Sequence, residues 1–128
     1  MAVLAVLLCL LLASCGGGST PPSSPSPPSN PNTFRLTAAG VTPKEMTVAP
    51  GSRVLFINDD TRSHDMTSDP HPDHQDCTEL NAVGNLTPGQ SRESGNLVVV
   101  RTCGFHDHSN PPPTTQAGNI WTGRIIIR

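Results

Sequence analysis

Short apolar stretches, each followed by turn residues, run through the last two thirds of the chain. Residues 34–37 alternate between apolar and polar positions, residues 44–48 do so more weakly, and residues 53–58 read as the clearest strand of this half. Ala49-Pro50-Gly51-Ser52 separates the second and third of these stretches with a Pro-Gly turn signal. No helical period is present, so the pattern predicts β-strands.

The second half continues in the same way. Residues 63–68 read as an extended piece, and residues 69–85 are irregular, acidic and rich in His and Pro. Pro88-Gly89 marks a turn, residues 96–102 predict a strongly β-branched strand, and residues 125–127 predict the last one. Regularly spaced short strands with Pro/Gly turns predict an all-β domain, a Greek-key β-sandwich or barrel of about seven strands.

The first 32 residues differ from the rest of the chain. Residues 2–13 form an apolar run that is too short to span a bilayer but suits a signal peptide, and Leu12-Ala13-Ser14-Cys15 resembles the lipobox of bacterial lipoproteins. This resemblance implies a lipid on Cys15, although no Lys or Arg precedes the apolar run. Residues 16–32 contain only Gly, Ser, Pro, Thr and Asn, which is typical of a disordered tether.

We therefore expect a signal peptide over residues 1–14, a lipidated Cys15 with a tether over residues 15–32, and one folded domain over residues 33–128. The anchor places the domain in the cell envelope, facing the periplasm or the exterior. Gly16 after the cysteine resembles the pattern of outer-membrane lipoproteins in Gram-negative bacteria.

Charge and aromatic content limit the function. The chain carries 8 Lys and Arg against 10 Asp and Glu, with a formal net charge of -2. Its aromatic residues are three Phe and one Trp. The chain has no excess of basic residues to neutralise phosphates and few aromatic residues to stack on bases, so we expect no nucleic-acid partner. The core is thin for a domain of this size, and a metal or a disulfide would stabilise it.

The candidate chemistry lies in five histidines and two cysteines. Cys103 and His106 are separated by two residues beyond the strand predicted at 96–102, and we expect a turn that aims both side chains at one point. His64 would arrive from another strand. One thiolate and two imidazoles suit copper in both oxidation states. His64, Cys103 and His106 are therefore the predicted metal ligands.

Several ordered motifs resemble the cupredoxins, the plastocyanin-like blue copper proteins. The resemblance covers residues 34–128 and rests on residues 48–58, Leu86-Thr87-Pro88-Gly89-Gln90, Cys103-x-x-His106 and the terminal Gly123-Arg124-Ile125-Ile126-Ile127. It implies a cupredoxin-like fold, copper as the cofactor and one-electron transfer to a redox partner protein. We expect no enzyme activity, because no open coordination position with an adjacent acid or base is evident.

The sequence also departs from this family. No methionine follows Met66, so the axial position is empty or is filled by His108, Gln116 or a backbone carbonyl. Met66 itself is expected to pack in the core. His108 is otherwise expected beside the metal without binding it, or on the surface.

Cys77 leaves three alternatives open. In an exported domain two cysteines commonly form a disulfide, and a Cys77–Cys103 bond would leave no thiolate for copper. Otherwise Cys103 is free, or both sulfurs approach the metal. His71 and His74 lie in the acidic segment and form either a solvated loop or a second metal-capture site. The competing functions are a copper-binding or storage lipoprotein without electron transfer, and a structural sandwich domain held by the disulfide.

Overall fold

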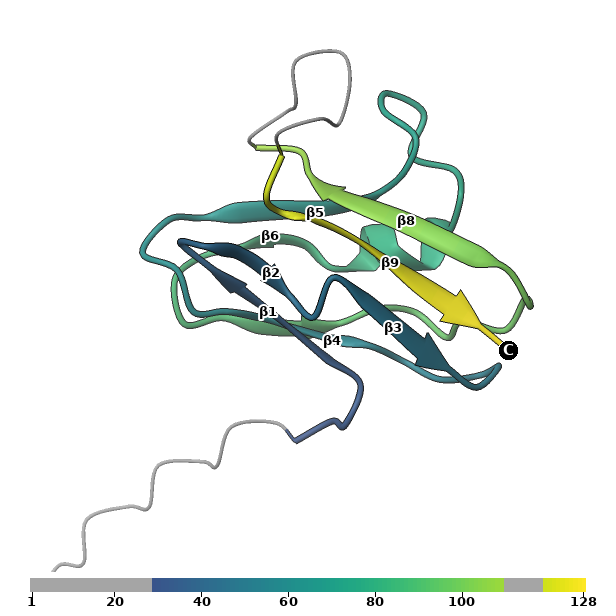
Figure 1. Ribbon diagram of the computed structural model, residues 1–128. Coiled ribbons are helices and arrows are strands. Elements are labelled where there is room, and N and C mark those ends of the chain that lie inside the picture. The colour runs from purple at the N-terminus through teal and green to yellow at the C-terminus, as the bar shows by residue number, and fades with distance from the viewer. Residues whose placement is uncertain (1–28, 110–118) are drawn as a thin grey trace, which may run out of the picture.

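Two β-sheets pack face to face in the computed structural model, which describes residues 29–109 and 119–128 (Figure 1). The four-stranded sheet has the order β2-β1-β4-β7 and the five-stranded sheet the order β3-β9-β8-β5-β6. The elements are β1 (Thr33–Thr37), β2 (Gly40–Thr42), β3 (Glu45–Val48), β4 (Leu55–Asn58), β5 (His64–Ser68), the 3-10 helix η1 (Thr78–Ala82), β6 (Gly84–Leu86), β7 (Ser91–Glu93), β8 (Thr102–Asp107) and β9 (Thr122–Ile127). The predicted all-β sandwich is confirmed.

The strand pairs are mostly antiparallel. β1 pairs with β4 in parallel, and β3 pairs with β9 in parallel, so each sheet is mixed. Strand β8 lies at the centre of the five-stranded sheet between β9 and β5. Its register places Thr67 of β5 opposite His106 and Met66 opposite Asp107.

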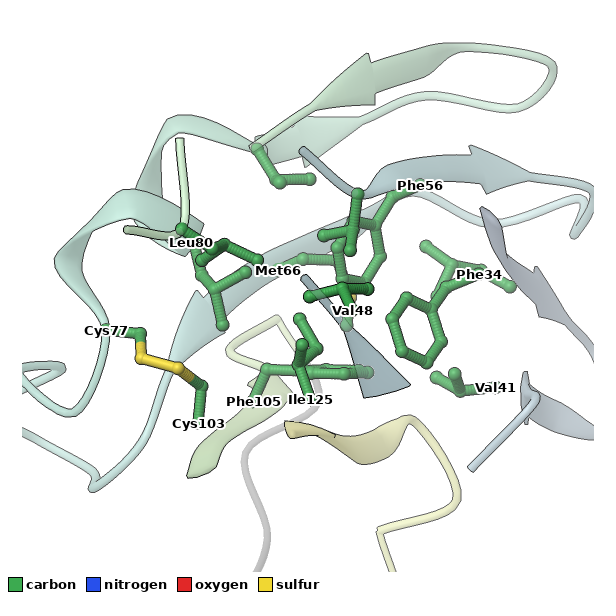
Figure 2. Packing of buried hydrophobic residues seen from close by; sticks show 14 of the residues in the cluster. Phe34, Val41, Val48, Phe56, Met66, Cys77, Leu80, Cys103, Phe105 and Ile125 are labelled. Atoms are coloured by element: carbon green, nitrogen blue, oxygen red, sulfur yellow. A yellow bond between two sulfur atoms is a disulfide. The ribbon is translucent and has the colours of Figure 1, made fainter. Parts of the chain in front are cut away.

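The core between the sheets is built on three phenylalanines. Phe34, Phe56 and Phe105 come from β1, β4 and β8, and their ring centroids lie 4.9 to 5.1 Å apart. Figure 2 shows Met66 and Ile125 beside them. Met66 is 1% exposed, which confirms the prediction that it packs in the core. Successive residues of a strand point to opposite faces, so alternate residues of each strand reach this cluster.

Most of the strands predicted from the sequence are present, with one exception that matters for the site. Residues 96–102 do not form the predicted strand. Leu97 makes an isolated bridge with Ser52, while Val98, Val99 and Val100 are exposed. The strand is β8, Thr102–Asp107, because pairing with β9 begins at Thr102. β-branched composition favoured the wrong segment, since it does not specify where a partner strand lies.

A disulfide joins Cys77, just before η1, to Cys103 in β8 (Figure 2). Both cysteines are fully buried at the end of the core. This was one of the alternatives left open by the sequence.

The predicted signal peptide, the lipidated Cys15, the tether up to residue 28 and Gln116 lie outside the described residues. Within residues 29–109 and 119–128, no helix is long and apolar enough to cross a membrane.

Candidate metal centre

Three histidines converge on the outer face of the five-stranded sheet. One ligand nitrogen from each of His71, His74 and His106 lies within 4.8 Å of the others. His106 belongs to β8, whereas His71 and His74 belong to the loop between β5 and η1 (residues 69–77, the histidine loop). The loop covers the His106 ring, which is 0% exposed. Imidazole nitrogens suit copper, zinc and nickel, so this cluster can hold a transition metal.

Strand alternation explains why His106 faces the histidine loop. In β8, Cys103, Phe105 and Asp107 share the core face, and His106 lies on the opposite face. His106 is 0% exposed even so, because the loop covers it from outside. The loop is held at its start, where the Asp69 N–H donates to the Gly104 carbonyl oxygen at 3.0 Å. At its end the Cys77 disulfide fixes it to the same strand.

Hydrogen bonds orient two of the three rings. Nδ1 of His74 donates to the Ser68 carbonyl oxygen at 2.8 Å, and Nδ1 of His106 lies 2.6 Å from Oδ1 of Asp69. In both rings Nε2 is the nitrogen that faces away from these partners, and in His106 it also lies 3.4 Å from the Thr67 hydroxyl oxygen, a long contact that a metal would replace. Metal-binding histidines in proteins usually use their second nitrogen in this way, bonded to a carboxylate or a backbone carbonyl.

His74 holds an uncommon backbone conformation. Its φ is 54°, in the left-handed region, where non-glycine residues are rarely found. Its N–H donates to the Pro70 carbonyl oxygen at 2.7 Å, and its carbonyl oxygen accepts from Nδ2 of Asn81 at 2.9 Å. Such conformations persist where the surrounding contacts enforce them, and they cluster at functional sites.

The surroundings of His71 favour its neutral form. Loss of hydration lowers the pKa of His71, and protonated His108, His74 and His106 lower it further. A metal ligand must be the neutral imidazole, so the low pKa of His71 is compatible with ligation.

The predicted ligands His64, Cys103 and His106 do not come together. The Cys103 sulfur is bonded to Cys77 and offers no thiolate. His64 lies on the core side of β5 in line with Met66, while His106 lies on the outer side of β8. The expected turn after Cys103 is a strand, in which residues three positions apart point to opposite faces.

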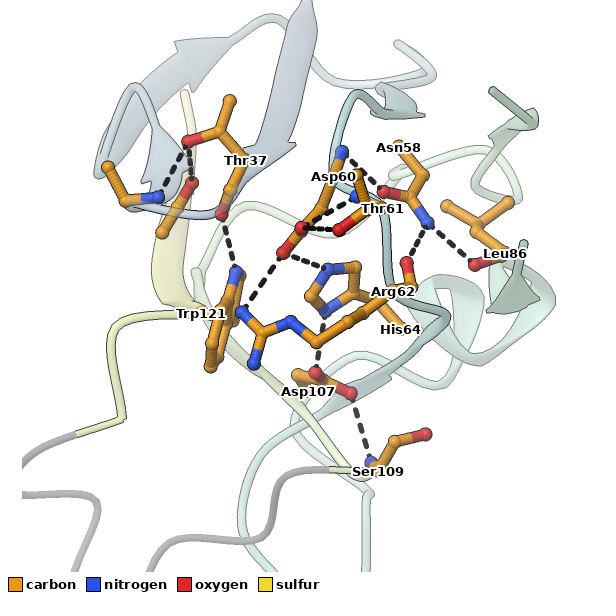
Figure 3. A network of polar contacts seen from close by, with 12 residues as sticks. Thr37, Asn58, Asp60, Thr61, Arg62, His64, Leu86, Asp107, Ser109 and Trp121 are labelled. Atoms are coloured by element: carbon orange, nitrogen blue, oxygen red, sulfur yellow. Dashed lines mark hydrogen bonds and ion pairs between the residues drawn. The ribbon is translucent and has the colours of Figure 1, made fainter. Parts of the chain in front are cut away.

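His64 instead joins a buried network of carboxylates (Figure 3). Its Nδ1 lies 2.8 Å from Oδ2 of Asp107 and its Nε2 lies 3.2 Å from Oδ2 of Asp60. Nη2 of Arg62 lies 3.1 Å from the same Asp60 oxygen, and its guanidinium lies 4.4 Å from the Trp121 ring centroid. The residue of β8 that faces His64 is thus Asp107, four positions beyond Cys103.

Several solved structures have a fold similar to that of this domain. Amicyanin from Paracoccus versutus matches with a TM-score of 0.59 and 13% identity, over 80% of this chain and 86% of that one. A purple cupredoxin from Nitrosopumilus maritimus matches with a TM-score of 0.55 and 14% identity, over 75% and 98%. Plastocyanin from Dryopteris crassirhizoma matches with a TM-score of 0.54 and 16% identity, over 75% and 99%. The domain has the cupredoxin fold. No sequence family and no curated protein matches the chain.

A blue copper centre does not fit this cupredoxin domain. Such a centre needs a thiolate beside two imidazoles. Opposite His64 the strand supplies the carboxylate of Asp107, and Cys103 is in a disulfide. The chain therefore keeps the fold, while its described residues offer no thiolate at the predicted place.

Two of the weaker metal candidates, His71 and His74, lie together with the predicted ligand His106, whereas Cys77 is in the disulfide. The sequence left His71 and His74 as either a solvated loop or a capture site, and the structure brings both against the buried His106. One signal was present in the sequence: His106 and His108 are two residues apart, so in an extended strand they share a face. The covering loop could not be predicted, because it depends on contacts with β8.

The buried network on the core side of the sheet predicts acid sensitivity. Burial alone would raise the pKa of Asp60, but hydrogen bonds from the Thr61 N–H, Arg62 and His64 outweigh it and lower the pKa. Asp60 therefore stabilises the fold above its unfolded pKa of about 3.9, and this contribution is lost as the pH falls through the lower folded-state pKa. A second carboxylate, that of Asp107, contacts the opposite nitrogen of the His64 ring.

We expect urea midpoints to fall between pH 5 and pH 3, and the fall to be smaller in Asp60→Asn. Asp59→Asn, at an exposed carboxylate, is the control and should keep the steep dependence. Equal slopes in wild type and Asp60→Asn would contradict the assignment.

Proposed function

We propose that this protein binds copper through histidine side chains on the outer face of its cupredoxin domain, and that it captures or stores the metal. The single observation that carries the proposal is the convergence of His71, His74 and the buried His106. Two of these rings are already oriented by hydrogen bonds to Ser68 and Asp69. A loop that lay free in solvent would leave the His106 ring exposed, whereas this ring is 0% exposed beneath the loop.

The charges around the cluster favour a cation. Asp69, Asp73 and Asp76 belong to the histidine loop, and Asp65 lies on the neighbouring strand. Neutral imidazoles leave the charge of a divalent ion unbalanced, so nearby carboxylates lower the free energy of the bound ion. The same carboxylates would attract the ion from solution.

Electron transfer of the blue copper type has less support. It rests on the fold alone, since the matching solved cupredoxins share 13 to 18% identity with this chain. The predicted redox partner protein is coupled to that function and stays a prediction. A structural role for the Cys77–Cys103 disulfide is compatible with metal capture, because the bond also fixes the histidine loop.

We further propose that a lipid on Cys15 and the tether hold the domain at a membrane of the cell envelope. The lipobox-like Leu12-Ala13-Ser14-Cys15 and the polar segment 16–32 support it. An oxidising compartment would also favour a disulfide. Fractionation of cells that express the full chain, compared with Cys15→Ala, tests this: the wild type should pellet with membranes and the variant should be released.

Addition of Cu(II) to the metal-free protein is expected to give one tightly bound ion with a weak visible band of the imidazole type. Optical titration followed by metal analysis after dialysis measures both features. An intense thiolate-to-copper band that disappears in Cys103→Ser would contradict the proposal and favour the blue copper centre. Absence of tight binding would leave the structural role of the domain.

A further inference from the structure

We propose that His108 is the fourth ligand and that His71, His74, His106 and His108 form a closed, near-tetrahedral metal site. This inference rests on the proposed copper-binding function and specifies its coordination. His108 follows β8, and 42% of its side chain is exposed. Its ring centroid lies 5.2, 5.0 and 6.3 Å from those of His71, His74 and His106, but the group of nitrogens within 4.8 Å of one another does not include it.

The spacing of the four rings carries the inference. Their six centroid separations are 5.4, 5.8, 5.2, 5.1, 5.0 and 6.3 Å. With metal–nitrogen bonds of about 2.0 Å, ring centroids lie about 3.2 Å from the ion and about 5.2 Å apart in a tetrahedron. A square-planar arrangement would give about 4.5 Å between neighbours and 6.4 Å across. Four of the six observed values are near the tetrahedral one, and the two longer ones both involve His106.

The longest separation, 6.3 Å, is between His106 in β8 and His108 in the turn that follows this strand. A small rotation of the exposed His108 side chain brings its ring closer, whereas the buried His106 is fixed by Asp69. Three of the ligand nitrogens already lie within 4.8 Å of one another, so metal binding would draw them together and add the solvent-facing His108.

His108 also lies near a carboxylate, at a longer distance than the hydrogen bonds that orient His74 and His106. Its Nδ1 lies 3.6 Å from Oδ2 of Asp65, the residue beside it on β5, and its N–H donates to the Asp65 carbonyl oxygen at 2.7 Å. Asp65 and Asp69 flank the cluster and together carry the charge that balances a divalent ion. Carboxylates in this position orient the ring and increase its basicity as a ligand.

A fourth protein ligand changes what the site can do. Catalytic metal sites keep a position for water or substrate, whereas four protein ligands close the coordination sphere. A closed site of four imidazoles favours retention of the ion, which agrees with capture or storage. It also extends the metals that fit to Zn(II) and Co(II), which accept tetrahedral geometry.

The test compares the full folded protein with His108→Ala and with Gln75→Ala, a control at an exposed residue of the histidine loop. Co(II) and Cu(II) are added separately to each. We expect wild type and control to show the intense visible absorption of tetrahedral Co(II) and four imidazole nitrogens around Cu(II) by pulsed EPR. His108→Ala should still bind one ion, with at least about tenfold lower affinity, weaker Co(II) absorption and one imidazole fewer.

Equal imidazole counts, affinities and Co(II) spectra in wild type and His108→Ala would overturn the four-histidine site and leave the three-histidine site standing. Loss of all binding in both proteins would instead overturn the proposed function. Circular dichroism of the metal-free proteins identifies any variant that fails to fold. For such a variant, His108→Gln repeats the comparison with a side chain of similar size.

Discussion

Replacement of His106 by alanine is expected to weaken copper binding by about 100-fold or more. His106 is the fully buried member of the cluster, and it is the ligand that the strand itself fixes in place. Its loss removes one metal–nitrogen bond and leaves Asp69 without the ring that it orients at 2.6 Å. Competition with a chelator of known affinity measures the change, and far-ultraviolet circular dichroism verifies the fold.

His64→Gln is the control that separates the two possible centres. His64 lies on the core side of the sheet between Asp60 and Asp107, so its replacement should lower the free energy of unfolding and leave copper affinity within about threefold. A blue copper centre would require both His64 and His106. Loss of copper binding in His64→Gln at a temperature where the variant is folded would therefore refute the outer-face site.

Sequence patterns predicted the sandwich well because its strands are short apolar or alternating stretches separated by turn residues. Residues 34–37, 53–58 and 63–68 overlap β1, β4 and β5, and the terminal isoleucines lie in β9. Short strands such as β2 and β7, with three residues each, were missed because they are too brief to show a period. Helix η1 lies in the segment read as irregular, and a single 3-10 turn has little pattern of its own.

The predicted metal site was wrong because one local structure, that of residues 103–106, was predicted wrongly. The Cys-x-x-His spacing was interpreted as a turn, in which Cys103 and His106 could meet at one metal. In the strand that the chain adopts, the three-residue separation sends Cys103 to the core and His106 outward. In a strand, residues an odd number of positions apart point to opposite faces and residues an even number apart point to the same face, so Cys103 shares its face with Phe105 and not with His106.

Removal of the Cys77–Cys103 disulfide is expected to cause a large loss of stability. Replacement of Cys77 and Cys103 together by alanine is expected to lower the free energy of unfolding by about 3.5 kcal/mol, from the chain entropy of a loop with this sequence separation. The two cysteines are 26 residues apart and both are fully buried. For a domain of this size the melting temperature should fall by about 15–25 °C. Thermal unfolding with and without a reductant measures it, since reductant should destabilise the wild type and leave the double variant unchanged.

The same bond also determines whether Cys103 is a disulfide partner or a free thiolate that can bind metal. A count of reactive thiols in the denatured, non-reduced mature domain should give none from Cys77 and Cys103. Two free thiols, together with an unchanged melting temperature in the double variant, would show that Cys103 is available as a thiolate. With the disulfide present, the histidine loop is closed at its Cys77 end onto the strand that carries His106. Its removal should therefore weaken copper binding as well as stability, because His71 and His74 would lose part of their ordering before the metal arrives.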